Sequence, residues 1–153
     1  MNELMRYEPV PVQDSEVFER VRNDKFPNLD GARILYIFDT KKKMSGKRIV
    51  FAWIKKLNDE MKFLAMNDDG ITYDYIVFIN KEVWNALEEA DRKRIAFHEF
   101  CHCEVDFEKV NPYGLKDHEI QGFYEEADYN IDDPRWNERI TVIAESVYDQ
   151  EEN

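Results

Sequence analysis

His98-Glu99-Phe100-Cys101-His102 is the stretch that decides what fold and chemistry this chain is expected to have. On an α-helix, positions 98 and 102 lie one turn apart, so both imidazoles leave the same face. Two such nitrogens can hold one Zn²⁺, and Glu99 lies where it can deprotonate a metal-bound water. The only other histidine in the sequence is His118. The motif therefore predicts a zinc-dependent hydrolase, most simply a peptidase.

Glu99 is the predicted catalytic residue. Zinc lowers the pKa of its bound water to about 7, so a weakly basic carboxylate suffices to take the proton. The resulting hydroxide attacks a carbonyl that zinc polarises, and Glu99 returns the proton to the leaving amine.

The third metal ligand, beside His98 and His102, is predicted to be His118, because an isolated histidine in an acidic segment has no other obvious role. The metzincin subclass is excluded, since its glycine and third histidine would fall at Val105 and Glu108. A later glutamate remains an alternative ligand, and the candidates are Glu119, Glu125, Glu126 and Glu145.

The sequence leaves the roles of other residues near the motif open. Asp106 and Asp117 are candidates to orient a ligating imidazole, or they are solvated acids. Cys101 is interpreted as a small buried thiol, because a fourth protein ligand would close the site. A tyrosine could stabilise an oxyanion, but the sequence selects none of the candidates Tyr113, Tyr124 and Tyr129.

The composition is that of a globular protein. The 153 residues, 43% of them hydrophobic, fit a single domain over residues 1–153, with residues 1–14 as an extended lead-in. No apolar stretch approaches the roughly 18 residues of a membrane span, and the N-terminus lacks a signal-peptide pattern. Two free cysteines fit a reducing compartment, so a cytoplasmic location is expected. The net charge of −12 predicts no nucleic-acid or membrane partner.

The order of elements predicts an α+β fold, in which a small twisted sheet of three or four strands is packed by helices. β-branched and aromatic runs bounded by turn residues indicate strands at 32–38, 48–54 and 75–79. We expect the strand at 75–79 to border the substrate cleft. Helical periodicity indicates helices at 16–22, 82–89, 91–107, 117–129 and 137–149.

Two blocks, 94–103 around the motif and 113–120 around His118, resemble the putative phage metallopeptidase family. That family is itself similar to small SprT-like zincins. The resemblance covers roughly residues 15–130. It implies a minimal zincin-like fold with the HExxH motif on a central helix. It also implies His98, His102 and His118 as zinc ligands, with Glu99 catalytic and, if the chain is phage-encoded, the host cytoplasm as its location.

Two other functions remain open from the sequence. The chain could be a zinc-stabilised binding protein that performs no chemistry, for which Glu99 would be dispensable. It could also be an acidic DNA mimic that occupies a basic partner, with binding that weakens steeply with salt. Substrate, cleavage preference, physiological metal and oligomeric state have no signature in the sequence.

Overall fold

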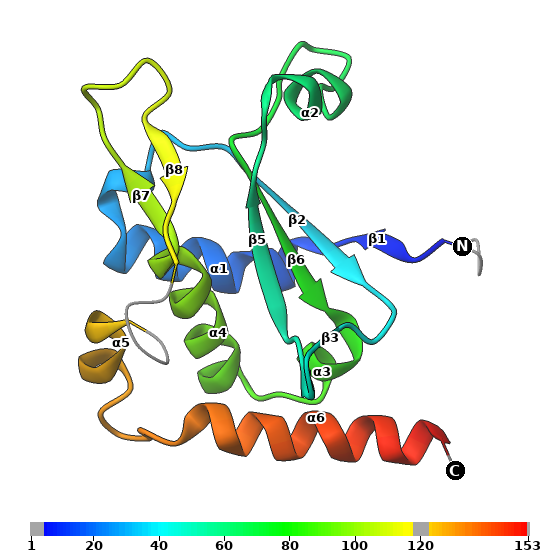
Figure 1. The fold of residues 1–153 in the computed structure, drawn as a ribbon. Coiled ribbons are helices and arrows are strands. Elements are labelled where there is room, and N and C mark those ends of the chain that lie inside the picture. The colour runs from blue at the N-terminus through cyan, green and yellow to red at the C-terminus, as the bar shows by residue number, and fades with distance from the viewer. Residues whose placement is uncertain (1–4, 118–122, 153) are drawn as a thin grey trace.

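The computed structural model describes residues 5–117 and 123–152. Helices and short sheets are mixed along the chain, so the predicted α+β class is confirmed. In Figure 1 the main sheet lies at the centre, and helix α6 (Trp136–Glu152) runs past one end of it. Helix α2 (Asp59–Leu64) and the hairpin of strands β7 (Cys103–Val105) and β8 (Tyr113–Leu115) project at the opposite end.

Four strands form the main sheet, in the order β1-β2-β6-β5. Strand β2 pairs with β6 in parallel, whereas the β1–β2 and β5–β6 pairs are antiparallel. The bounds of the main strands are Tyr7–Pro9 (β1), Ile34–Asp39 (β2), Ala52–Lys56 (β5) and Tyr75–Asn80 (β6). Two small hairpins add β3 (Met44–Ser45) with β4 (Arg48–Ile49), and β7 (Cys103–Val105) with β8 (Tyr113–Leu115).

Helices fill the remaining segments. They are α1 (Val12–Lys25), α2 (Asp59–Leu64), α3 (Lys81–Asn85), α4 (Glu89–Cys101), α5 (Tyr124–Tyr129) and α6 (Trp136–Glu152), with a short 3-10 helix at Pro27–Leu29. The asparagines before α2 and α3 cap them: the side chains of Asn58 and Asn80 accept hydrogen bonds from backbone N–H groups of the first turn. Among the described residues, no helix has the length and apolar character that crossing a membrane requires.

The prediction that the strand at 75–79 borders the substrate cleft is wrong. Strand β6 lies inside the sheet, between β2 and β5, and the edge nearest the motif helix is β5. Strand β6 is almost wholly buried, as its continuous apolar run would predict for a strand with neighbours on both sides. Strand β5 ends in exposed Lys55 and Lys56, and lysines are typical of an edge strand.

Several expected helix boundaries also differ. Helix α1 begins at Val12, so the last residues of the expected lead-in are helical, and Tyr7–Pro9 is a strand. Helix α4 ends at Cys101 rather than near 107, because the segment from Cys103 pairs as a strand with β8. Only Tyr124–Tyr129 of the expected helix 117–129 is described as helical.

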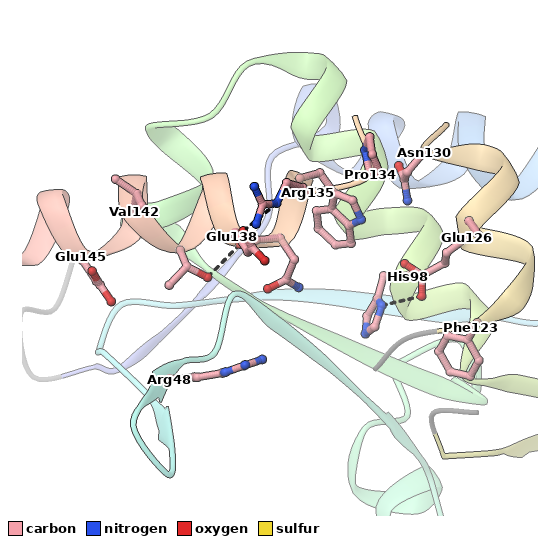
Figure 2. A pocket seen from close by; sticks show the side chains of 14 residues that line it. Arg48, His98, Phe123, Glu126, Asn130, Pro134, Arg135, Glu138, Val142 and Glu145 are labelled. Atoms are coloured by element: carbon pink, nitrogen blue, oxygen red, sulfur yellow. Dashed lines mark hydrogen bonds and ion pairs between the residues drawn. The ribbon is translucent and has the colours of Figure 1, made fainter. Parts of the chain in front are cut away.

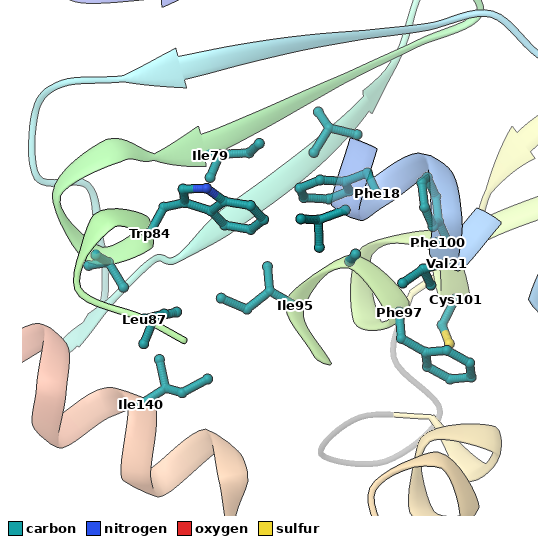
Figure 3. Packing of buried hydrophobic residues seen from close by; sticks show 14 of the residues in the cluster. Phe18, Val21, Ile79, Trp84, Leu87, Ile95, Phe97, Phe100, Cys101 and Ile140 are labelled. Carbon is teal, nitrogen blue, oxygen red and sulfur yellow. The ribbon is translucent and has the colours of Figure 1, made fainter. Parts of the chain in front are cut away.

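The hydrophobic core joins the sheet to α1, α3, α4 and α6, as Figure 3 shows. Phe18 on α1 is fully buried at its centre, with ring centroids 5.4 Å from Trp84 and 5.9 Å from Phe100. Phe100 lies within the motif, and it faces the core while its histidine neighbours face outward. The packing of Phe100 therefore fixes the rotation of α4 about its axis, which positions the histidines.

We predict that Phe18→Ala lowers the free energy of unfolding by about 3–5 kcal/mol, because it opens a cavity among three aromatic rings. Chemical denaturation measures the loss. Phe63→Ala is the matched control, since Phe63 is 73% exposed and its truncation is expected to change stability by less than about 0.5 kcal/mol. Equal losses in the two variants would contradict the assignment of the core.

Candidate metal centre

The two motif histidines line one hollow on the surface, together with Glu99. Its volume is about 420 Å³. One wall is the edge strand β5, through Ala52, Trp53 and Ile54, and the other is the end of β8 with the two residues that follow it, residues 115–117. His98 lies in the last turn of α4 and His102 is the helical residue that caps it, so the helix spacing is retained. Their ring centroids are 5.3 Å apart.

His98 is held by a carboxylate from another helix. Its Nδ1 lies 2.8 Å from Oε1 of Glu126 on α5, and both side chains are largely buried, at 17% and 7% exposure. Burial of the ring works to lower the pKa of His98, but the hydrogen bond to Glu126 and the charges of Glu99 and Glu126 outweigh it and raise the pKa. A carboxylate on one ring nitrogen orients the imidazole and makes its other nitrogen a better donor to a metal.

His102 is oriented in the same way by the backbone. Its Nδ1 lies 2.8 Å from the carbonyl oxygen of Lys116, just after β8. The backbone N–H of Lys116 in turn donates to the carbonyl of His102, at 2.7 Å. Pairing of β7 with β8 therefore brings residue 116 back to the end of α4. The ring of Phe123 packs against both imidazoles, with centroids 5.7 Å from His98 and 4.9 Å from His102.

Glu99 is buried, with 5% of its surface exposed, and it lines the hollow beside both histidines. The pKa of Glu99 is raised to about 7. Burial is the largest cause of this shift; the charge of the His98 ring works to lower the pKa, and the charge of Glu126 works to raise it. The carboxyl group is thus poised between its acid and its base form near neutral pH, as general acid–base catalysis requires.

Helices α4 and α5 run antiparallel, and two side-chain contacts one turn apart join them. His98 bonds to Glu126, and Arg94 donates from Nη1 to the side-chain oxygen of Asn130 at 2.9 Å. Arg94 also forms a bidentate pair with Asp132 at 3.1 and 2.7 Å. Asn130 N–H donates to the Glu126 carbonyl, so the Arg94 contact holds the helix turn that carries the carboxylate.

Several residues that the sequence proposed are placed elsewhere. Asp106 accepts a hydrogen bond from the Glu108 N–H in the hairpin loop, so it does not orient His102. Cys101 is 1% exposed within the core, as its interpretation as a buried thiol predicts. Asp117 does line the hollow.

None of the described glutamates that the sequence offered as alternative ligands, Glu125, Glu126 and Glu145, is placed as a third ligand beside the two histidines. Glu126 contacts the Nδ1 atom of His98, as an orienting group does. Trp136 lies 6.2 Å from the His98 ring, but Glu145 is nine residues further along α6, about 13 Å away along the helix axis. Glu125 is exposed on α5.

His118 and Glu119 lie outside the described residues. Within residues 5–117 and 123–152, no group of three His, Cys, Asp or Glu side chains is arranged to hold a metal ion. Two of the three predicted ligands are thus brought together, and the third stays a prediction.

Two of the three candidate tyrosines for an oxyanion, Tyr113 and Tyr129, do not line the hollow. Tyr113 packs edge-on against Tyr75, and its hydroxyl lies where a side chain at Gly31 would need to be. Tyr129 stacks on Phe97 at 3.9 Å between centroids. The side chain of Tyr124 lies outside the described part of the chain.

Comparison with protein families finds a match over residues 10–148 to the family described as putative phage metallopeptidase. The chain belongs to this family. The match confirms the resemblance found in the sequence and extends it beyond residues 15–130. A search of curated proteins and a search of solved structures each found no significant match. Membership supports metal-dependent peptidase activity and the minimal zincin-like form of the fold.

In this phage metallopeptidase family member, two further cavities meet the hollow at His98. The larger, about 450 Å³, lies between α5, α6 and β4, as Figure 2 shows. The smaller, about 160 Å³, lies between the β4–β5 segment, α4 and α6, and is lined by both His98 and Glu99. The sequence pointed to neither Arg48 nor Trp136, which line both, because no local motif links these distant segments to residue 98.

Proposed function

We propose that this chain is a zinc-dependent metallopeptidase, in which His98, His102 and His118 bind the metal and Glu99 is the catalytic base. The observation that carries the proposal is the pairing of two imidazoles in one hollow, each held at Nδ1 by an oxygen acceptor. Histidines that ligate a metal almost always have such a partner on the other ring nitrogen.

The donor set fits zinc. Imidazole nitrogens suit this ion, and three protein ligands leave one position of a tetrahedron for water or substrate. Because Nδ1 of each described histidine contacts an oxygen acceptor, we take Nε2 as the coordinating atom of both. When bound, the ion would act as a Lewis acid that lowers the pKa of water and polarises the substrate carbonyl.

Glu99 has the position for the proton transfers. Its carboxylate would take a proton from the attacking water and deliver it to the leaving nitrogen. The low exposure of Glu99 keeps bulk water away from its carboxylate, which strengthens the electrostatic interactions of this group within the hollow. Positive charge beside it would favour its ionised, basic form.

Strand β5 offers a track for the substrate backbone. Among the described strands only β6 pairs with it, and its other edge borders the hollow. An extended peptide can add to such an edge through main-chain hydrogen bonds, which select for an extended conformation rather than for a sequence. We therefore infer a peptide or protein substrate, with its scissile bond near Glu99. A cytoplasmic location, in the host cell if the chain is phage-encoded, stays part of the proposal.

The two alternatives make different demands on Glu99. A zinc-stabilised binding protein needs the histidines but gains nothing from a buried carboxyl group whose desolvation is unfavourable. An acidic DNA mimic needs neither. The burial of Glu99 beside the histidines therefore favours the peptidase.

We predict that Glu99→Gln retains zinc but lowers kcat for peptide hydrolysis at least about 100-fold, because an amide cannot accept the proton. Hydrolysis of a casein or peptide-library substrate by the zinc-loaded protein, with metal content measured in parallel, checks this. Glu104→Gln is the matched control, since Glu104 is an exposed residue of β7. A Glu99→Gln protein that hydrolyses as fast as wild type would overturn the mechanism.

We further predict that Glu126→Ala weakens zinc binding about 10–100-fold, because the His98 ring loses the acceptor that fixes it. Competition with a chelating dye measures the dissociation constant. Asp128→Ala removes the same charge from an exposed position of the same helix and is expected to leave it unchanged. Equal affinities in the two variants would show that Glu126 does not orient a ligand.

A further inference from the structure

One arginine faces the candidate site without any partner that the described residues supply. Arg48, on the short strand β4, lines both cavities that adjoin His98. Its guanidinium makes no hydrogen bond or ion pair with any described residue. Figure 2 shows it reaching across the cavity, away from Glu145 and toward the end where His98 and Phe123 lie.

The other charged side chains of the cavity are engaged or distant. Glu126 is bonded to His98. Arg135 and Glu138, just before and within the first turn of α6, pair with each other at 3.2 Å. Glu145 lies at the far end of the cavity from His98 (Figure 2). Among the charged side chains that line this cavity, Arg48 is therefore the cation best placed to meet a negative group on a molecule that enters beside His98.

The smaller cavity has the size and lining of a side-chain subsite. Its volume is about 160 Å³, close to that of an apolar cavity that holds a benzene ring. Ile49, Phe51, Ile95 and Trp136 give it apolar walls, and His98 and Glu99 border it. An aliphatic or aromatic side chain of the substrate would be removed from water there, next to the peptide bond whose hydrolysis Glu99 would catalyse.

We propose that this cavity and Arg48 form a substrate subsite for an apolar side chain that carries, or is directly followed by, a carboxylate. The proposal rests on the peptidase function and names its substrate class. An extended residue spans about 3.3–3.6 Å, so a carboxylate on or next to the residue in the cavity falls just beyond the scissile bond. Guanidinium groups bind carboxylates through two parallel hydrogen bonds. The carboxylate is either a free C-terminus or an acidic side chain.

The positive charge of Arg48 is opposite in sign to the net charge of the protein. The net charge of −12 repels an anionic peptide at long range. A single cation at the cavity selects such peptides only when their carboxylate is in register with it. The subsite therefore gives positional selectivity rather than general attraction.

Binding to the zinc-loaded Glu99→Gln protein tests the subsite without requiring cleavage. The probes are two pairs of acetylated peptides: Gly-Gly-Phe with a free carboxylate or as its amide, and the amides of Gly-Gly-Phe-Glu and Gly-Gly-Phe-Gln. We expect the carboxylate member of one pair to bind at least about tenfold more tightly in calorimetry. The first pair responds if the group is a C-terminus, and the second if it is a side chain.

Arg48→Ala, made in the same Glu99→Gln background, should abolish this preference, and Arg48→Lys should restore part of it. Lys47→Ala is the control, because it removes the same charge from the neighbouring exposed position of the hairpin. Arg48 is itself exposed, so its replacement leaves the core intact. No preference in the parent protein, or a preference that survives Arg48→Ala because the carboxylate binds zinc instead, overturns the proposal.

The outcome is separable from that of the peptidase proposal. If the protein with Glu99 intact hydrolyses no peptide, the peptidase proposal fails while the binding comparison still decides the subsite. If it hydrolyses peptides with no preference that depends on Arg48, the subsite fails and the peptidase proposal stands.

Discussion

The hydrogen bonds at Nδ1 of His98 and His102 are the constraint on which the candidate site depends. One acceptor is a carboxylate on α5 and the other is a backbone carbonyl after β8. Neither acceptor belongs to the motif helix, so the orientation of the two rings depends on how α4, α5 and the segment after β8 pack together. Phe100 fixes the rotation of α4 from the core side, and the Arg94–Asn130 contact fixes α5 against it. Ligand geometry is thus a product of the whole fold rather than of five consecutive residues.

This dependence explains which parts of the site could be predicted from the sequence. The spacing of His98, Glu99 and His102 is local, and helix geometry alone places the three side chains near one another. Glu126 is 28 residues from His98, and its contact exists only because α5 packs antiparallel to α4. A longer helix would place Asp106 one turn after His102, but the chain leaves the helix before Cys103, and Asp106 lies in a hairpin loop.

The sheet shows the same limit. Three strand-like runs were evident from their composition, and the mixed α+β class follows from their order. Composition reports how deeply a strand is buried, whereas the position of a strand in the sheet is set by pairing between distant segments. The apolar run of β6 therefore indicated a strand correctly but was assigned to the wrong place, and β5 became the edge beside the hollow. The substrate track that we propose is therefore Ala52–Lys56 instead of residues 75–79. The β3–β4 hairpin, which carries Arg48, comes directly before this strand and also borders the site.

X-ray absorption spectroscopy at the zinc edge tests the central claim most directly. Zinc-loaded wild-type protein should show imidazole nitrogens at about 2.0–2.1 Å and no sulfur ligand. Separate replacement of His98, His102 and His118 by alanine should each remove one imidazole from the metal shell. Sulfur in the coordination shell, or a shell unaltered by loss of His98 or His102, would contradict the account.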